Sequence, residues 1–123
     1  MEIRNLDAAE SFTTADGSAI RELLGPATVP ARNQSLAEAT IEAGGSTKRH
    51  QHRIAEEIYF IVEGEGRMEI DADVATVGVG DAILIPPGSW HQITASDTGR
   101  LRLLCACAPP YSHDDTYFEP ETL

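Results

Sequence analysis

The segment from Gly44 to Gly64 reads GGSTKRHQHRIAEEIYFIVEG and ends in a run rich in β-branched and aromatic residues. His50 and His52 are two residues apart, so on a strand both side chains would project from the same face. Glu57 follows at the start of the hydrophobic run. The segment therefore predicts a buried strand that begins beside a group of potential metal ligands.

A second segment, GDAILIPPGSWH over residues 80–91, places a Pro-Pro-Gly turn shortly before His91. Proline fixes φ and glycine permits a reversal, which would direct His91 toward the interior of a sheet. Only residues 65–79 lie between the two segments. That length is enough for one hairpin and too short for an inserted domain.

Short apolar runs separated by Gly, Pro and Asp continue through the chain from residue 35 onward. We expect strands over residues 36–43, 57–62, 67–70, 82–85, 90–94 and 101–107, with a hairpin turn over 97–99. Six or more strands at this spacing predict an all-β sandwich or barrel. The best helical candidate is short, residues 19–24, and Gly25-Pro26 would end it. Residues 1–34 are turn-rich and are expected to extend a sheet edge.

Composition narrows the class of protein. A chain of 123 residues corresponds to one domain. Nine Lys and Arg against twenty Asp and Glu give a net charge of −11, which argues against nucleic-acid and membrane-surface binding. No apolar stretch approaches the ~20 residues of a membrane span, and the first ten residues have no export signal. We expect a cytoplasmic protein.

The two cysteines, Cys105 and Cys107, are separated by one residue. Neighbours on one strand face rarely have the geometry of a disulfide, and two thiols are too few for a structural zinc site. We expect them to be buried, reduced thiols that pack as small hydrophobic residues.

Three neutral imidazoles and one carboxylate suit a divalent first-row metal and leave coordination positions open. The alternative is that each histidine is a hydrogen-bonded polar residue near a strand end, and the residues alone leave both interpretations open. His113 has no partner at ligand spacing, and we expect it to be a surface histidine.

The glycines and prolines around the histidines extend the pattern. Residues 44–64 resemble the first signature motif of the cupin superfamily, G-x5-H-x-H-x4-E-x6-G. Residues 80–91 resemble the second motif, G-x5-P-x-G-x2-H-x3-N, although Ala95 replaces its final asparagine. The resemblance covers about residues 35–108. Positive φ is expected at Gly64 and at Gly44 or Gly45, where tight connections need it.

The resemblance implies a small, single-domain double-stranded β-helix, a jelly-roll barrel with one metal ion inside it near one mouth. The ligands it implies are His50, His52, Glu57 and His91. Glu56 is the competing acid, but only Glu57 has the spacing to Gly64 that the motif requires. The ion would be divalent Mn, Fe, Ni or Zn.

Strand alternation places Tyr59 inward with Glu57, where its hydroxyl could donate a proton or anchor a substrate; ordinary packing is the alternative. The expected lining of the pocket is Ile61, Met68, Ile93, Leu103, Cys105 and Tyr111, with Met68 also contributing to the core. Lys48, Arg49 and Arg53 could hold an anionic substrate at the entrance or could be solvated loop charges.

The acidic, aromatic tail over residues 109–123 is expected to be a solvated end with its aromatic residues packed on the body, or a lid over the pocket. Residues 1–34 offer material for a homodimer arm that covers an exposed sheet edge.

The sequence is compatible with two functions. The first is a metal-dependent enzyme acting on a small organic molecule, with dioxygenase chemistry favoured and isomerase, cyclase or lyase chemistry as further options. The second is a non-catalytic module that binds a metal or a ligand.

Overall fold

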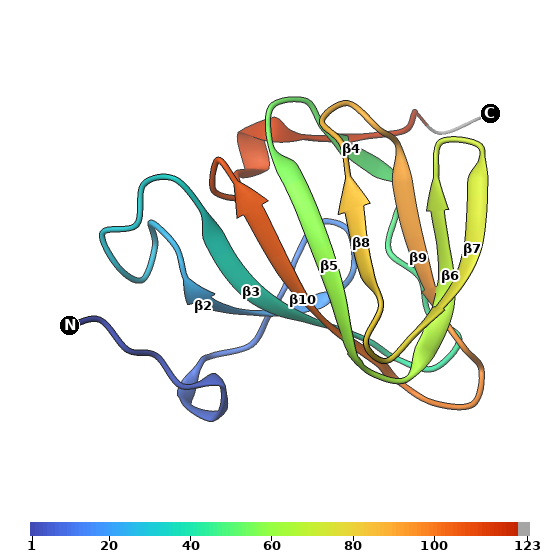
Figure 1. The fold of residues 1–123 in the computed structure, drawn as a ribbon, viewed down its shortest axis with the longest axis horizontal. Helices are drawn as coiled ribbons and strands as arrows, with labels where there is room; N and C mark the ends of the chain where they lie inside the picture. Colours follow the sequence, from blue (N-terminus) through green and yellow to red (C-terminus); the bar gives the residue numbers. More distant parts are fainter. Residues whose placement is uncertain (121–123) are drawn as a thin grey trace.

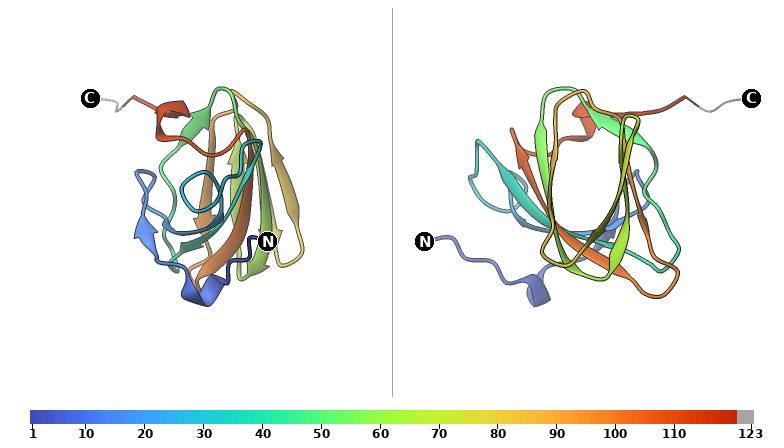
Figure 2. Two further views of the ribbon diagram at one scale, coloured as in Figure 1. Left: turned by 90° about the vertical axis from the view of Figure 1, so that its left-hand side faces the viewer. Right: turned by 45° about the vertical axis from the view of Figure 1, so that its right-hand side comes forward.

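Two antiparallel sheets form a jelly-roll barrel in the computed structural model, which describes residues 1–120 (Figure 1). One sheet has six strands in the order β1-β2-β3-β10-β5-β8, and the other has five in the order β11-β4-β9-β6-β7. The expected all-β double-stranded β-helix is confirmed, and Figure 2 shows the two sheets curving around a common interior. The elements are η1 (Leu6–Ala8), β1 (Phe12–Thr13), β2 (Ala19–Leu24), β3 (Ser35–Ile41), β4 (His50–His52), β5 (Glu56–Glu63), β6 (Glu65–Ile70), β7 (Asp73–Gly78), β8 (Ala82–Ile85), β9 (His91–Ala95), β10 (Leu101–Ala108), η2 (His113–Asp115) and β11 (Thr116–Phe118).

Strand β5 shows how the sequence pattern becomes a sheet with two different faces. Glu57, Tyr59 and Ile61 are buried, while the residues between them are exposed. This alternation follows from the two-residue period of a strand, and it confirms the inward direction expected for Tyr59. Strand β10 pairs with both β5 and β3, so it lies inside the six-stranded sheet. It contributes a second row of side chains that point into the barrel.

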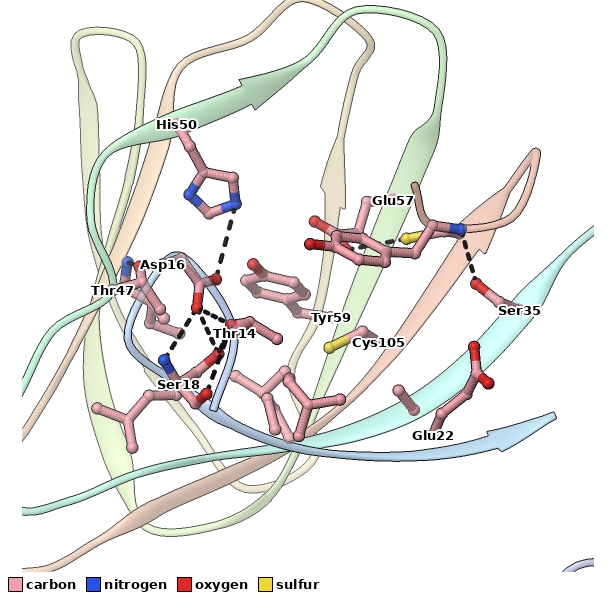
Figure 3. Close-up of a pocket in the computed structure, with 18 of the residues that line it drawn as sticks. Thr14, Asp16, Ser18, Glu22, Ser35, Thr47, His50, Glu57, Tyr59 and Cys105 are labelled. Carbon is pink, nitrogen blue, oxygen red and sulfur yellow. Dashed lines mark hydrogen bonds and ion pairs between the residues drawn. The ribbon is translucent and has the colours of Figure 1, made fainter. Parts of the chain in front are cut away.

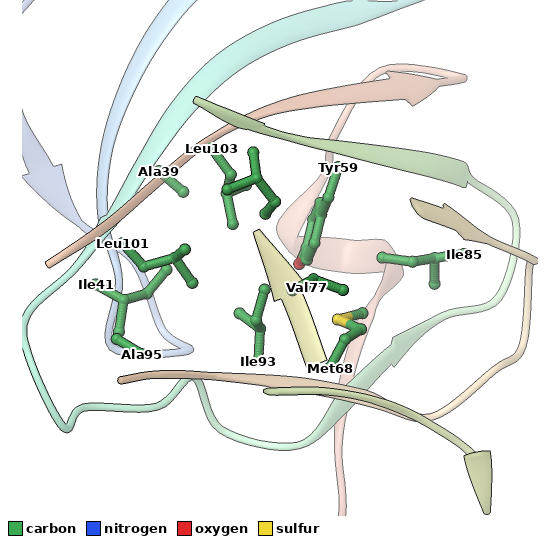
Figure 4. Close-up of a cluster of buried hydrophobic side chains, with 11 residues drawn as sticks. Ala39, Ile41, Tyr59, Met68, Val77, Ile85, Ile93, Ala95, Leu101 and Leu103 are labelled. Atoms are coloured by element: carbon green, nitrogen blue, oxygen red, sulfur yellow. The ribbon is translucent and has the colours of Figure 1, made fainter. Parts of the chain in front are cut away.

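A hydrophobic cluster fills the space between the sheets (Figure 4). Its most deeply buried members have at most 1% of their surface exposed: Ile61, Ile85, Ile93, Leu101 and Leu103. Met68 belongs to the same cluster. Burial of aliphatic side chains from both sheets is the main stabilising contribution in such a fold.

The helical interpretation of residues 19–24 is wrong. This segment is strand β2, and it pairs with β3 from Ala19 opposite Thr40 to Leu24 opposite Leu36. Six residues are too few for a helix that is stable by itself, so the backbone partners offered by β3 decide the conformation.

The hairpin expected at residues 97–99 is also wrong, because β9 and β10 belong to different sheets. The turn carries the chain across the barrel, and each strand pairs elsewhere, β9 with β6 and β10 with β3 and β5. By contrast, residues 65–79 form the single hairpin expected there, strands β6 and β7.

The two ends of the chain complete the barrel. Strands β1 and β2 extend the six-stranded sheet beyond β3, and β11 pairs with β4 at the edge of the other sheet. Residues 121–123 of the expected tail lie outside the described residues. No helix within residues 1–120 is long and apolar enough to cross a membrane. The homodimer stays a prediction.

Gly64 generates a test of this fold. It connects β5 to β6 with φ of +81°, and a methyl group added there would collide with the carbonyl oxygen of Arg100. We expect Gly64→Ala to lower the free energy of unfolding by about 2–4 kcal/mol in urea titrations. Gly78→Ala is the matched control, because Gly78 has open space around it, and its effect should stay within about 0.5 kcal/mol. Equal effects of the two substitutions would contradict this account.

Candidate metal centre

Three histidines and one glutamate converge inside one end of the barrel. Ligand atoms of His50, His52 and His91 all lie within 4.8 Å of one another. Glu57 Oε1 is 3.6 Å from His52 Nε2 and 3.4 Å from His91 Nε2. All four residues are buried. The four expected ligands therefore lie together, whereas Glu56, the competing acid, is exposed.

Backbone pairing brings the two sequence segments into contact. His50 on β4 lies opposite His91 on β9 in the antiparallel register. The Pro-Pro-Gly turn reverses the chain at Gly88, whose φ is +81°, and the Gly88 amide donates a hydrogen bond of 2.6 Å to the carbonyl of His52. The turn thus links the His52 and His91 segments directly, as its position before His91 suggested.

Each imidazole is oriented through its other ring nitrogen. The Nδ1 atoms lie 2.7 Å from the Lys48 carbonyl for His50, 3.3 Å from the Asp115 carbonyl for His52 and 3.1 Å from the Ser89 carbonyl for His91. A carbonyl oxygen can only accept, so each Nδ1 carries the proton and each Nε2 has a free lone pair. This arrangement is typical of metal-binding histidines.

Two buried ligand atoms have no hydrogen-bond partner within residues 1–120, namely Glu57 Oε1 and His91 Nε2. Burial of an unpaired polar atom is costly, and native structures contain few of them. A divalent cation bound between the imidazoles and the carboxylate would satisfy both atoms. The residues present therefore fit the metal that the donor set implies.

The charges at the site match that interpretation. Burial on its own would raise the pKa of Glu57, but the close approach of His52 and His91 and the hydrogen bond from Cys107 hold this pKa far below its usual range. Burial lowers the pKa of His50, and the adjacent His91 lowers it further. Burial alone would also lower the pKa of His52, but the adjacent Glu57 carboxylate and the Asp115 carbonyl raise it overall. An ionised carboxylate therefore faces imidazoles, of which His50 is held neutral.

The cysteines are free, and one of them supports the carboxylate. Cys107 Sγ donates a hydrogen bond of 3.0 Å to Glu57 Oε2, the oxygen that does not face His91. Burial raises the pKa of both Cys105 and Cys107, so each is held as a protonated thiol. Their expected role as packed, reduced thiols agrees with this placement.

A pocket leads from the metal centre along the interior of the six-stranded sheet (Figure 3). Four of the expected lining residues do line it, namely Ile93, Leu103, Cys105 and Tyr111. Ile61 and Met68 do not; they lie in the hydrophobic core, because their positions on β5 and β6 are deeper in the barrel than the pocket reaches. Tyr59 lines the pocket, and its ring centroid is 6.1 Å from that of His91. Burial raises the pKa of Tyr59, so its phenol remains a proton donor.

The three cations near the histidines contact the C-terminal segment instead of the pocket. Arg53 stacks on Tyr117, with its guanidinium carbon 3.7 Å from the ring centroid. Lys48 Nζ lies 6.0 Å from the centroid of Phe118, and Arg49 forms an ion pair of 3.4 Å with Glu119. These contacts hold residues 117–119 against the barrel, and none of the three cations lines the pocket.

Two functional residues escaped the sequence analysis. Asp16, on the turn between β1 and β2, places Oδ2 3.9 Å from His50 Nε2, and its Oδ1 accepts hydrogen bonds from the side chains of Thr14 and Ser18 and from the Ser18 amide. The Asp16-Gly17 pair predicts a turn, but nothing in it predicts contact with a histidine 34 residues away.

Asp115 is the second such residue. Its carboxylate accepts hydrogen bonds from the backbone amides of Arg53, Ile54 and Ala55, and its own carbonyl orients His52. A short acidic tail has no sequence signal for this role. Part of the expected tail is thus a structural support for a ligand.

Replacement of Asp115 tests that support. Asp115→Ala would leave three backbone amides without their acceptor and would loosen His52, so we expect about 2–4 kcal/mol of destabilisation and a loss of metal affinity of roughly 10–100-fold. Competition with a chromogenic chelator measures the affinity. Asp114→Ala, an exposed neighbour on the same turn, is the control and should change neither quantity. Unchanged metal affinity in Asp115→Ala would show that the Asp115 carboxylate does not support the site.

Comparison with known proteins supports the fold and the family. The cupin domain family model matches residues 37–107, which include all four candidate ligands. An uncharacterized protein of Methanocaldococcus jannaschii, MJ1618, is 46% identical over 110 residues, covering 89% of this chain and 88% of that protein.

Two solved structures share the fold at low sequence identity. The polyketide cyclase RemF from Streptomyces resistomycificus has a TM-score of 0.84 at 20% identity, covering 99% of this chain and 87% of that one. Pac13, a nucleoside dehydratase of Streptomyces, has a TM-score of 0.79 at 16% identity, covering 97% and 91% of the two chains. With both signature segments, the family match and this architecture in agreement, the chain belongs to the cupin family.

Proposed function

We propose that this cupin is a metal-dependent enzyme that acts on a small organic molecule at His50, His52, Glu57 and His91. The observation that carries the proposal is the pair of buried, unpartnered ligand atoms, Glu57 Oε1 and His91 Nε2, beside a pocket that Glu57, His50 and His52 line. A non-catalytic binding module is the alternative. The acid and base groups beside the ligands favour an enzyme, because a purely structural ion has no need of them.

A bound divalent ion would act as a Lewis acid toward an oxygen atom of the substrate. The chain's own residues would do the rest. Apolar residues such as Ile93 and Leu103 would exclude water from the reacting group. The Tyr59 hydroxyl, buried and protonated, could donate a hydrogen bond or a proton. Asp16 Oδ2, beside His50, is placed to accept a proton from a carbon next to the polarised oxygen.

Asp16 and Tyr59 together favour proton-transfer chemistry, that is an isomerase, a cyclase or a lyase. The sequence favoured a dioxygenase, and the donor set of three imidazoles and one carboxylate keeps oxygen activation as the second candidate. The cyclase and dehydratase named among the structural relatives support the same preference, although their similarity to this chain is one of fold.

Metal content tests the proposed centre. The protein purified without chelator after metal-replete growth should contain about one divalent ion per chain by elemental analysis, and His50→Ala and Glu57→Ala should lose most of it. His113→Ala and Glu56→Ala are matched controls, because both residues are exposed, and they should retain the ion. Sub-stoichiometric metal in the unmodified protein would refute the proposed function.

A second measurement separates the two chemistries. With a panel of 1,3-diketones in deuterated buffer, we expect the metal-loaded protein to exchange the carbon-bound protons between the carbonyl groups faster than buffer does, as followed by NMR. Asp16→Asn should slow this exchange at least ~100-fold with its metal content intact. Asp73→Asn, an exposed acid on β7, should exchange at the normal rate. Oxygen uptake without proton exchange would favour the dioxygenase instead.

A further inference from the structure

The pocket has a second polar end, far from the metal centre. Tyr59 on β5, Cys105 on β10, Ala37 on β3 and Glu22 on β2 lie opposite one another in register, and all four line the pocket. Three strand spacings separate Tyr59 from Glu22, which corresponds to ~14 Å. The row has its smallest side chain, Ala37, in the middle, so the pocket continues across the sheet toward Glu22 (Figure 3).

The carboxylate of Glu22 has no hydrogen bond or ion pair to another side chain or to the backbone among the described residues, although it is half-buried. Burial raises its pKa, as expected for an acid that no cation compensates. Gly25 leaves room for it, because a Cβ on Gly25 would lie 2.5 Å from Glu22 Oε1. The acid thus faces the pocket with its hydrogen-bonding capacity unused.

Charge is distributed unevenly along the pocket. Its lining contains three carboxylates, those of Asp16, Glu22 and Glu57, and no lysine or arginine. The metal-ligand end would attract an oxygen donor once its ion is bound, whereas the Glu22 end would repel any anion. The walls between the two ends are mainly small or apolar, including Ile20, Ala37 and Leu103.

We propose that the substrate is an elongated, neutral or cationic molecule that carries an oxygen donor for the metal at one end and a hydroxyl or amine for Glu22 at the other. This inference rests on the proposed function, because the metal anchors one end of the substrate. It does not rest on the acids alone, since the unpartnered Glu57 Oε1 and His91 Nε2 point independently to a ligand at the other end. The charge of Glu22 disfavours carboxylates and phosphate esters at its end of the pocket.

Hydroxamic acids, which chelate divalent metals, test the proposal without knowledge of the reaction. The probes share a six-carbon chain and differ at the remote end: 6-aminohexanohydroxamic acid, hexanohydroxamic acid and adipic monohydroxamic acid. Calorimetric titration of the metal-loaded protein should rank the amine first, roughly tenfold tighter than the methyl-ended probe, and the carboxylate last. Glu22→Gln should remove the advantage of the amine while leaving the affinity of the methyl-ended probe unchanged.

Glu65→Gln is the matched control, because Glu65 is exposed and does not line the pocket, and it should preserve the ranking. Equal affinities of the three probes, or a ranking that Glu22→Gln leaves intact, would overturn this inference while the metal site stands. Failure of all three probes to bind the metal-loaded protein would overturn the proposed function, and this inference with it.

Discussion

The buried carboxylate of Glu57 is the group on which the arrangement of the site depends. An ionised acid inside a barrel is costly unless neighbouring groups compensate it, and here His52, His91 and the Cys107 thiol approach its two oxygens. Both imidazoles are themselves held in place, His52 by the Asp115 carbonyl and His91 by the carbonyl of Ser89. Glu57 Oε1 nevertheless lacks a hydrogen bond, and that deficit calls for a cation.

The arrangement of the site around Glu57 also depends on segments that lie outside the central strands. The C-terminal residues orient His52 through the Asp115 carbonyl and close the loop before β5 through the hydrogen bonds that the Asp115 carboxylate accepts from three backbone amides. The N-terminal turn places Asp16 beside His50. Residues 113–119 thus pack on the barrel, and Asp115 among them supports a candidate ligand. Both ends of the chain contribute polar groups to the surroundings of one small centre.

Local spacing explains what the sequence could predict. Two histidines on one strand face, an acid at the start of the next strand and a Pro-Pro-Gly turn before His91 are short-range patterns, and all four residues meet as expected. Short-range patterns of this kind do not predict contacts between segments that are distant in the sequence. The sequence of residues 19–24 is compatible with a helix, and only its pairing with β3 makes this segment a strand. Asp115 is separated by more than 60 residues from the His52 ring that it orients. Ile61 and Met68 face the interior as predicted, but alternation cannot tell how deep a pocket reaches into that interior.

The family match begins at residue 37 and ends at residue 107, and within it lie the four candidate metal ligands and the central strands. Much of the remaining pocket wall comes from outside that range, including Phe12, Asp16, Glu22 and Tyr111. One barrel could therefore supply the proposed metal chemistry to different substrates, with its flanking segments determining which molecule reaches the site. On this view the −11 net charge is not only a property of the surface. Two of its acids, Asp16 and Glu22, extend into the pocket from the N-terminal flank, where they would select the substrate by charge.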